Sequence, residues 1–488
     1  MEYHSPMHKL AVSIAIFFLL VAAAPKRPVP HVAEKQRAAA TIDSKRDELT
    51  RLSDEIWRYA ETALLETRSS KALADYAEQH GFKVTRGVAA MPTAFVAEFG
   101  TGRPVIGIMG EFDALPGISQ KAQSSKEALQ PNAAGHGCGH NLFGVGSLAA
   151  AIAVKDLIAA GKLQGTLRFF GTPAEEAVSG KTYMLRDGIM DGVDVMLVWH
   201  PADETGADTK STQAIIDIDV EFRGRASHAA FDPWNGRSAV DGLEIFTHAV
   251  NMMREHIPPT ARMHYAIVNG GQVPNVVPEY ARVWIWLRDL EMRDVDAMLI
   301  RLRKMAAGAA MAADVESTVN VRGGSWNMNV NMAGQRLLYS NLQWLGPVQF
   351  TPEEQTFARE IQRASGVAEK GLNTKVEPFE DKPGPAEGGS TDVGDVSWKI
   401  PTINLSVATA AVGAPWHGWP VVACGGMSIG HRGMIHAAKA LAATMVDLYK
   451  TPAHVTAITN EFKEDTETSP YKPYIPAGAP ELPPSGPR

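Results

Sequence analysis

Short apolar segments that alternate with helical patterns constrain the fold of this chain more than any other feature. Segments 104–110, 167–171 and 193–199 are almost continuously apolar, as strands buried inside a parallel sheet are. Between the first two, residues 144–160 form an alanine-rich segment of helical character. Strands that alternate with helices predict an α/β fold, in which helices cover both faces of a mixed, largely parallel sheet.

The pattern changes near residue 211. Six segments then follow in the order strand, helix, strand, strand, helix, strand, at residues 214–222, 238–255, 263–268, 281–287, 295–312 and 317–321. This order predicts a small α+β domain of ferredoxin-like type. A chain of 488 residues is also too long for one hydrophobic core. We therefore expect a larger domain made of residues 25–210 and 331–455, with residues 211–330 inserted as a second domain.

The two ends of the chain differ from the rest. Residues 10–24 read LAVSIAIFFLLVAAA, an apolar run that is short for a membrane span and ends in an A-x-A pattern. This predicts a signal peptide over residues 1–24 and export to the periplasm or the medium; an uncleaved membrane anchor is the alternative. Residues 456–488 are assigned to a proline-rich tail, in which residues 469–488 are dense in proline and predict an irregular, exposed segment.

Residues 135–141, Gly-His-Gly-Cys-Gly-His-Asn, place three side chains that bind metals within five positions. Glycines allow a tight turn, and side chains two residues apart point the same way in an extended chain. We expect Cys138 and His140 to converge on one ion. A glycine-rich turn with a buried thiol is the alternative, and a disulfide between Cys138 and Cys424, the two cysteines of the chain, would exclude the metal site.

Other polar stretches also follow predicted strands, where open parallel sheets place their ligand sites. They are residues 110–116 with Glu111 and Asp113, 172–176 with Glu175 and Glu176, 199–201 with His200, and 415–418 with His417. Each alone has an ordinary explanation, such as solvated acids at a helix start. Together they bring a cysteine, histidines and acids to one edge of one sheet.

Adjacent carboxylates such as Glu175 and Glu176 do not both ionise cheaply unless a cation lies nearby. With a metal present, one can ligate while the other takes a proton from water, whose pKa a metal lowers to ~7. This arrangement predicts hydrolysis of amide bonds. The net charge of −7 and the absence of a long basic run exclude a nucleic-acid partner.

The motifs GHGCGHN, TPAEE, VWHP, GRASHAA and PWHG together resemble the aminoacylase and carboxypeptidase family of two-metal amidohydrolases. GSTDVGDVSW and GMSIGHRGM make the chain most similar to the branch that hydrolyses p-aminobenzoyl-glutamate, over about residues 47–450. The resemblance implies two divalent ions, Mn or Zn, held by five ligands: Cys138, His140, Glu176, His200 and His417. It also implies Glu175 as the general base and the inserted domain as a lid that mediates dimerisation.

In the inserted domain, the resemblance makes His228 the histidine that reaches a neighbouring subunit's site and stabilises the oxyanion. Asn275 and Arg288 match substrate-binding positions, although a strand-end salt bridge is an equal alternative for Arg288. Where other branches have His-x-Asp, this chain has Glu111-Phe112-Asp113, so Glu111 is an uncertain ligand and Asp113 is expected to orient a ligand. His136 has no partner in this scheme and is expected to support the turn.

The resemblance therefore implies a metal-dependent hydrolase of N-acyl amino acids, with an aromatic acyl group and an acidic amino acid as the expected substrate. It also implies a homodimer or a hetero-oligomer with a related subunit. A dipeptidase or carboxypeptidase of the same family is the first alternative. A non-catalytic partner subunit on the same fold is the second, although Glu175 and the five ligand positions are all present.

Overall fold

The computed structural model describes residues 1, 29–386 and 389–481. The predicted signal peptide, apart from Met1, and the last seven residues of the predicted tail therefore lie outside the described residues. The elements used below are α1 (Val32–Ser44), α2 (Arg46–Tyr59), α3 (Thr67–Gln79), β1 (Lys83–Arg86), β2 (Phe95–Thr101), β3 (Val105–Gly110), α4 (His140–Ala159), β4 (Gly165–Gly171), α5 (Glu175–Val178), α6 (Gly180–Arg186), β5 (Val195–Ala202), β6 (Gly206–Ala207), β7 (Ala214–Arg223), α7 (Ala239–Met253), β8 (Arg262–Asn269), β9 (Tyr280–Asp289), α8 (Met292–Ala313), β10 (Glu316–Ser325), α9 (Met332–Leu345), α10 (Pro352–Ser365), α11 (Val393–Ser397), β11 (Thr402–Ala408), α12 (Trp419–Gly425), α13 (Ser428–Lys450) and α14 (Pro452–Thr466).

Seven strands form the larger sheet, in the order β1-β2-β4-β3-β5-β11-β6. The four central strands, β4, β3, β5 and β11, are parallel neighbours. The strands toward both edges, β1, β2 and β6, pair antiparallel. The predicted mixed, largely parallel α/β fold is confirmed, and the carboxyl ends of the parallel strands lie at one edge, where ligand sites are expected.

Helices α4 and α13 pack against each other and against the central strands. Almost every residue of α4 is buried, because its alanine- and leucine-rich sequence faces the sheet on one side and α13 and α2 on the others. In the described part of the chain, α4 is the one helix long and apolar enough to cross a membrane, and 78% of that stretch is buried inside the protein. The first residue of α4 is His140, so this core helix fixes one predicted ligand.

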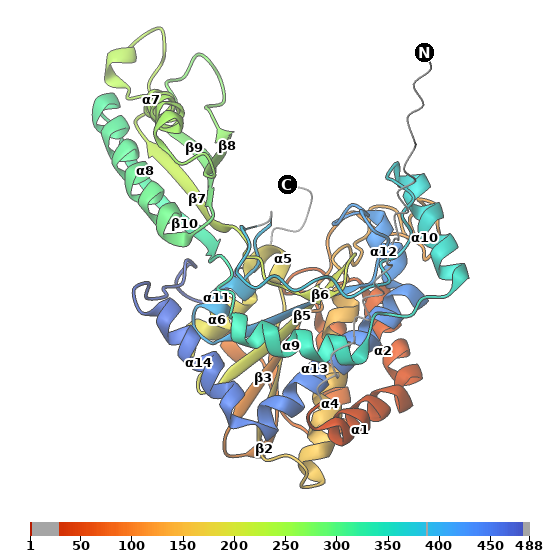
Figure 1. Cartoon of the computed structure of the whole chain (residues 1–488). Helices are drawn as coiled ribbons and strands as arrows, with labels where there is room; N and C mark the ends of the chain where they lie inside the picture. Colours follow the sequence, from red (N-terminus) through yellow and green to blue (C-terminus); the bar gives the residue numbers. More distant parts are fainter. Residues whose placement is uncertain (2–28, 387–388, 482–488) are drawn as a thin grey trace. The chain divides into compact units, whose positions relative to one another are not determined.

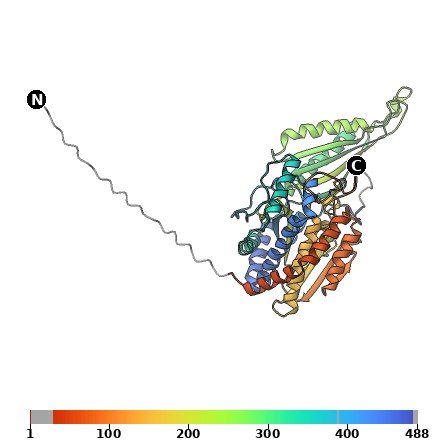
Figure 2. The ribbon, with the colours of Figure 1, turned by 90° about the vertical axis from the view of Figure 1, so that its right-hand side faces the viewer.

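The inserted segment forms a second sheet of four antiparallel strands, in the order β10-β7-β9-β8. Helices α7 and α8 cover one face of this sheet, as Figures 1 and 2 both show. Along β9 the residues alternate between buried and half-buried, and the buried set, such as Val283 and Ile285, meets Phe246 and Leu302 in a separate hydrophobic core. The boundaries at residues 211 and 330 stay a prediction.

The residues assigned to the tail begin with a helix that was not predicted. Residues 452–466 form helix α14, because Ile458 is buried against the main core and the Glu461 carboxylate accepts hydrogen bonds from the backbone N–H groups of Met332 and Ala333. Beyond it no regular element forms up to residue 481, yet the Tyr474 ring is buried in the core of the inserted segment. The prediction of a tail from residue 456 was therefore wrong for residues 456–466.

A buried histidine on α13 makes the stability of the fold depend on pH. Burial, and then the charge of Lys439, lower the pKa of His436 to about 4, whereas an unfolded histidine titrates near pH ~6.5. The unfolded state therefore binds the proton more readily, and stability is lost as pH falls from ~6.5 to ~4, by about 3 kcal/mol for this group. We expect the free energy of unfolding of His436→Gln, measured with urea, to fall by about 3 kcal/mol less than that of the wild type when the pH is lowered from 7 to 4. The exposed His264→Gln should behave like the wild type.

Candidate metal centre

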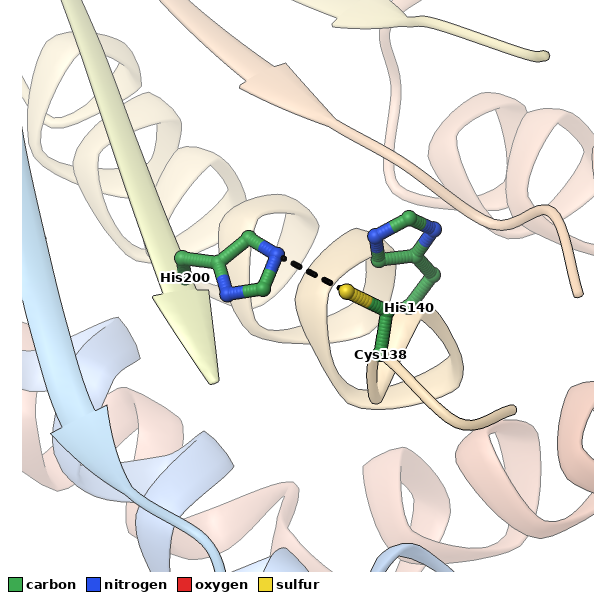
Figure 3. A group of neighbouring side chains, drawn as sticks. All are labelled: Cys138, His140 and His200. Atoms are coloured by element: carbon green, nitrogen blue, oxygen red, sulfur yellow. Dashed lines mark hydrogen bonds between the residues drawn. The ribbon is translucent and has the colours of Figure 1, made fainter. Parts of the chain in front are cut away.

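The glycine-rich turn carries Cys138 and His140 into the site through a left-handed residue. Gly139 has φ of 74°, and helix α4 starts at the next residue. The chain is therefore not extended between Cys138 and His140, and the expected reason for their convergence was wrong. The turn nonetheless brings the Cys138 Sγ, a His140 ring nitrogen and a His200 ring nitrogen within 4.8 Å of one another (Figure 3).

The loop before α12 brings His417 to the same turn. Its backbone N–H donates to the Gly137 carbonyl at 3.1 Å. A Cβ atom on Gly137 would lie 2.4 Å from the Ile118 side chain and 3.2 Å from the His417 backbone, so glycine is required for this approach. His417 itself has φ of 55°, a left-handed conformation that is rare outside glycine and is often found at functional sites. Its Nε2 lies 3.6 Å from the Cys138 Sγ.

His200 comes from β5, close to its carboxyl end. Its Nδ1–H donates to the Pro201 carbonyl at 2.7 Å, which leaves the lone pair on Nε2. Nε2 lies 3.5 Å from the Cys138 Sγ, the contact drawn in Figure 3. Burial, together with His140, lowers the pKa of His200 to about 4, so the ring is neutral at pH 7, as a metal ligand must be.

Two groups of ligand atoms share the Cys138 sulfur. One consists of Cys138, His140 and His200, and the other of Cys138, Glu176 and His417; within each group the atoms lie within 4.8 Å of one another. In the second group the Glu176 Oε2 and the His417 Nε2 are 3.5 Å apart. All five side chains that the motifs mark as ligands are thus brought together, in two sets of three that meet at one thiol.

His140 is held between two acids. Its Nδ1 is 2.9 Å from the Asp113 Oδ1, the contact that the expected orienting role of Asp113 requires. Asp113 Oδ2 also accepts from the Glu176 backbone N–H at 3.0 Å. On the other side of the ring, Nε2 lies 2.9 Å from the Glu111 Oε2. Burial disfavours the charged ring, but Glu111, Cys138 and Asp113 together outweigh it and raise the pKa of His140 well above its usual value.

Glu175 and Glu176 form the first turn of the short helix α5, which follows β4. The residue before them, Ala174, has φ of 63°, which is strained for alanine. Burial, and then the charges of Glu111 and Glu176, raise the pKa of Glu175 well above its usual value. Burial also raises the pKa of Glu176 to about 7, and that of the Cys138 thiol. The site therefore gathers acidic groups that ionise with difficulty unless positive charge is added.

The donor set fits divalent cations. Three atoms at the site, His140 Nε2, Glu111 Oε2 and Glu176 Oε1, are buried and have no hydrogen-bond partner among the described residues, although the first two are in contact. Buried polar atoms without partners are costly, and a cation between them removes that cost. One thiol, three imidazoles and a carboxylate suit Zn and accept Mn or Co.

A buried lysine and a buried aspartate adjoin this cluster, and neither was predicted from the sequence to have a role in the site. Lys181, on α6, places its Nζ 2.6 Å from the Glu111 Oε1 and 2.6 Å from the Asp392 Oδ1. Asp392 lies in the GSTDVGDVSW motif, so its position had a signal in the sequence. Lys181 had none, because a single lysine after a glycine is typical of any exposed turn.

His136 and Cys424 do not join the cluster. The His136 Nε2 is 3.0 Å from the Ile56 carbonyl oxygen, which fits the expected support of the turn. Cys424 is a buried free thiol, and Cys138 is free as well. The competing disulfide between them is therefore not formed.

The predicted residues of the inserted segment lie apart from the ligand cluster. His228 is exposed, and its Nδ1 accepts hydrogen bonds from the backbone N–H groups of Ala230 and Phe231, so its Nε2 carries the proton. The Asn275 carbonyl accepts from the Ala229 N–H, next to His228. Among the described residues, the hydrogen bonds and ring contacts of His228 stay within the inserted segment.

Arg288 is the next-to-last residue of β9 and has different partners. Its Nη1 donates to the Ser390 hydroxyl at 3.3 Å, and its guanidinium stacks on the Trp286 ring at 5.1 Å. Neither partner carries a negative charge, so the strand-end salt bridge is not formed within the described residues. The guanidinium is half-buried and remains a donor for a carboxylate.

Comparison with known sequences places these motifs in one family. Residues 107–405 match the profile of Peptidase family M20/M25/M40. The chain is 38% identical over 462 residues to a p-aminobenzoyl-glutamate hydrolase subunit from Escherichia coli (strain K12), across 89% of this chain and 96% of that relative. It is 29% identical over 455 residues to the human Xaa-Arg dipeptidase, across 88% of this chain and 92% of that relative.

Solved structures share the fold. A dinuclear metal-binding peptidase of the M20 family from Bacillus subtilis superposes with a TM-score of 0.57 at 16% identity, across 84% of this chain and 99% of that chain. An aminobenzoyl-glutamate utilization protein from Klebsiella pneumoniae gives a TM-score of 0.57 at 17% identity, across 84% and 98%. At these identities the likeness concerns the fold alone.

Proposed function

Because the chain belongs to peptidase family M20/M25/M40 and is a metal-dependent hydrolase of amide bonds, we propose that it cleaves N-acyl amino acids of the p-aminobenzoyl-glutamate type. The observation that carries this proposal is the pair of three-residue ligand groups that meet at Cys138. These two groups, at one edge of the sheet, would hold two divalent ions. The relative named for that substrate aligns along 96% of its own length.

We assign Cys138, His140 and His200 to one ion and Cys138, Glu176 and His417 to the other, with Mn or Zn as the expected metals. Divalent ions bound there would supply activation of water and polarisation of the scissile carbonyl. Asp113 fixes the His140 ring by its bond to Nδ1 and holds the Glu176 backbone through its second oxygen. One carboxylate thus positions a ligand of each ion.

Glu175 acts as the general base and then as the acid. It precedes the ligand Glu176 in the same helical turn, and desolvation of this half-buried carboxyl group, with other carboxylates nearby, raises its pKa. A carboxyl group with a raised pKa accepts a proton from water and returns it to the leaving amine at neutral pH. The charge of the buried Lys181 opposes this rise, but Lys181 is already bonded to Glu111 and Asp392.

His228 supplies a hydrogen-bond donor to the oxyanion from a neighbouring subunit. Support comes from its tautomer, since two backbone N–H groups occupy Nδ1 and leave a proton on Nε2. An exposed donor on the inserted segment needs another subunit to complete the site, so we propose a homodimer or a hetero-oligomer with a related chain. The Escherichia coli relative is itself named as a subunit, which supports an assembly of this kind. Export through the N-terminal segment is proposed on the sequence alone.

Arg288 selects an acidic amino acid, and Asn275 adds a polar contact to the substrate. A guanidinium binds a carboxylate through two parallel hydrogen bonds, and Arg288 has no acidic partner among the described residues. This favours p-aminobenzoyl-glutamate over the second candidate substrate, a dipeptide ending in arginine, which the 29% identity to the Xaa-Arg dipeptidase brings forward. A cationic substrate side chain would be repelled by Arg288.

Substrate profiling tests this choice. The wild type loaded with Mn or Zn is expected to hydrolyse p-aminobenzoyl-glutamate and N-acetylglutamate with a higher kcat/KM than Ala-Arg. Arg288→Gln should raise the KM for the glutamate substrates about tenfold or more, because a charge-assisted hydrogen bond contributes about 1.5–3 kcal/mol, and should leave N-acetylalanine much less affected. Faster cleavage of Ala-Arg by the wild type would replace the proposed substrate with the dipeptide.

A further inference from the structure

A row of buried charges joins the ligand cluster to the base of the inserted segment. The side chains of Lys181 and Asp392 have no exposed surface, and Glu111 is 1% exposed. Lys181 Nζ bonds Glu111 and Asp392, and the second oxygen of Glu111 contacts the His140 ring. The row thus runs with alternating sign from Asp392 through Lys181 and Glu111 to His140.

Asp392 holds Lys181 at two points. Its Oδ1 takes the ammonium group at 2.6 Å, and its Oδ2 accepts the backbone N–H of Lys181 at 2.9 Å. Removing a lysine charge from water costs several kcal/mol unless its partners are well placed. Asp392 and Glu111 are well placed because each lies 2.6 Å from the Lys181 ammonium group. If Asp392 or Lys181 moves, Glu111 must therefore move as well.

The segment that carries Asp392 also supports both chain crossings into the inserted segment. Before β7, the Gln213 N–H donates to the Gly389 carbonyl and the Gln213 carbonyl accepts from the Ser390 hydroxyl at 2.7 Å. After β10, the Trp326 N–H donates to the Asp395 carboxylate at 3.1 Å. The Asn329 N–H donates to the Ser397 hydroxyl at 2.9 Å. Residues 389–398, the GSTDVGDVSW motif, therefore contact both crossings directly and are linked to the metal cluster through Lys181 and Glu111.

Ser390 completes the link, because its hydroxyl accepts the hydrogen bond from Arg288. Only Thr391 separates Ser390 from Asp392 in the sequence. The segment thus fixes the guanidinium proposed to bind substrate and, through Lys181, the acid beneath His140.

We propose that Lys181 and Asp392 are positioning residues of the hydrolytic site. They hold Glu111 against His140 and, through the segment 389–398, fix the position of Arg288 relative to the metal ligands. The inference rests on the proposed function, because it concerns the same site. A purely structural ion pair would stabilise the fold without affecting metal affinity or turnover of the folded protein.

The chain offers a matched control for that distinction. Lys35 on α1 forms a second buried ion pair, 2.8 Å from the Asp447 Oδ2 on α13, with side chains 2% and 1% exposed. This pair contacts Asn341 and lies in the helical layer, outside the ligand cluster. Lys181→Met and Lys35→Met therefore remove the same charge from equally buried sites.

The experiment compares the two variants in the full chain. Folded fraction is measured by thermal unfolding, Zn and Mn affinity by titration of the metal-free protein, and kcat and KM on p-aminobenzoyl-glutamate. Both variants should unfold at lower temperature. Lys181→Met should lose about 10–100-fold in metal affinity or in kcat per folded molecule, whereas Lys35→Met should keep both. Equal metal affinity and kcat in both variants would overturn the proposal.

Two further outcomes are decisive. If Lys181→Met does not fold, Asp392→Asn tests the same link, because the amide keeps the shape and one acceptor oxygen; wild-type metal affinity and kcat in this variant would overturn the proposal. If the wild type binds metal but cleaves neither acyl amino acids nor dipeptides, the proposed function fails. The metal affinities of the variants then still decide whether Lys181 positions the site.

Discussion

Replacing Glu175 by glutamine is expected to lower kcat about 10²–10⁴-fold, the range typical of general acid–base catalysis. Glutamine has nearly the same shape but neither accepts a proton from water nor returns one to the amine. A third group brings Glu175 together with Glu111 and His140, but neither of the two groups that share Cys138, to which we assign the ions, includes Glu175. The variant should therefore keep its bound metal, and the loss should fall on kcat far more than on KM. Steady-state kinetics and metal analysis on the same preparation measure the two effects.

Glu353 provides the matched control. It also starts a helix, α10, next to a second glutamate, and it is exposed. This is the solvated arrangement that served as the ordinary explanation for Glu175 and Glu176. Glu353→Gln should retain wild-type kcat. If Glu175→Gln loses less than about tenfold, which corresponds to roughly 1.4 kcal/mol of barrier, Glu175 is not the base and the proton must move through another group.

The sequence predicted the large elements because their burial leaves a clear pattern. Strand β3, buried at all six positions, follows from an uninterrupted apolar run, and the alternation along β9 follows from one covered face. The helices and strands of the inserted segment were predicted in their correct order for the same reason. Helix α14 was missed, because its place in the fold depends on distant partners, Met332 and Ala333, which bond Glu461.

The ligand cluster was recognisable for a different reason. Its residues follow separate strands or turns of the chain, and a parallel sheet brings the carboxyl ends of its strands to one edge. They are Cys138, His140, Glu176, His200 and His417. The expected extended conformation between Cys138 and His140 was nevertheless wrong, because Gly139 has φ of 74°. Glycine tolerates both positive and negative φ, so the sequence does not tell which of them the residue adopts. Lys181 was missed altogether, because its burial depends on the carboxylates of Glu111 and Asp392, which come from distant parts of the chain.

Cys138→Ala is expected to abolish binding of both ions at micromolar metal, because its sulfur is the one atom that belongs to both three-residue groups. Activity should fall about 10³-fold or more, since metal ions contribute several kcal/mol to stabilisation of the transition state. His417→Ala removes a ligand from one group alone, so its stoichiometry should fall from two ions to one. Metal content after dialysis gives both numbers directly.

Cys424→Ala separates the metal role of Cys138 from the general effect of losing a thiol. Cys424 lies on α12, is buried in a third, small hydrophobic cluster with residues such as Ile361 and Ile429, and belongs to neither ligand group that contains Cys138. Its replacement should cost some stability, because it leaves a small cavity, while two ions remain bound. The cobalt-loaded wild type and Cys424→Ala should both show sulfur-to-cobalt charge-transfer absorption, which Cys138→Ala should lack. Two ions bound to Cys138→Ala would show that the sulfur bridges nothing, and that the two sites are held independently by His140 with His200 and by Glu176 with His417.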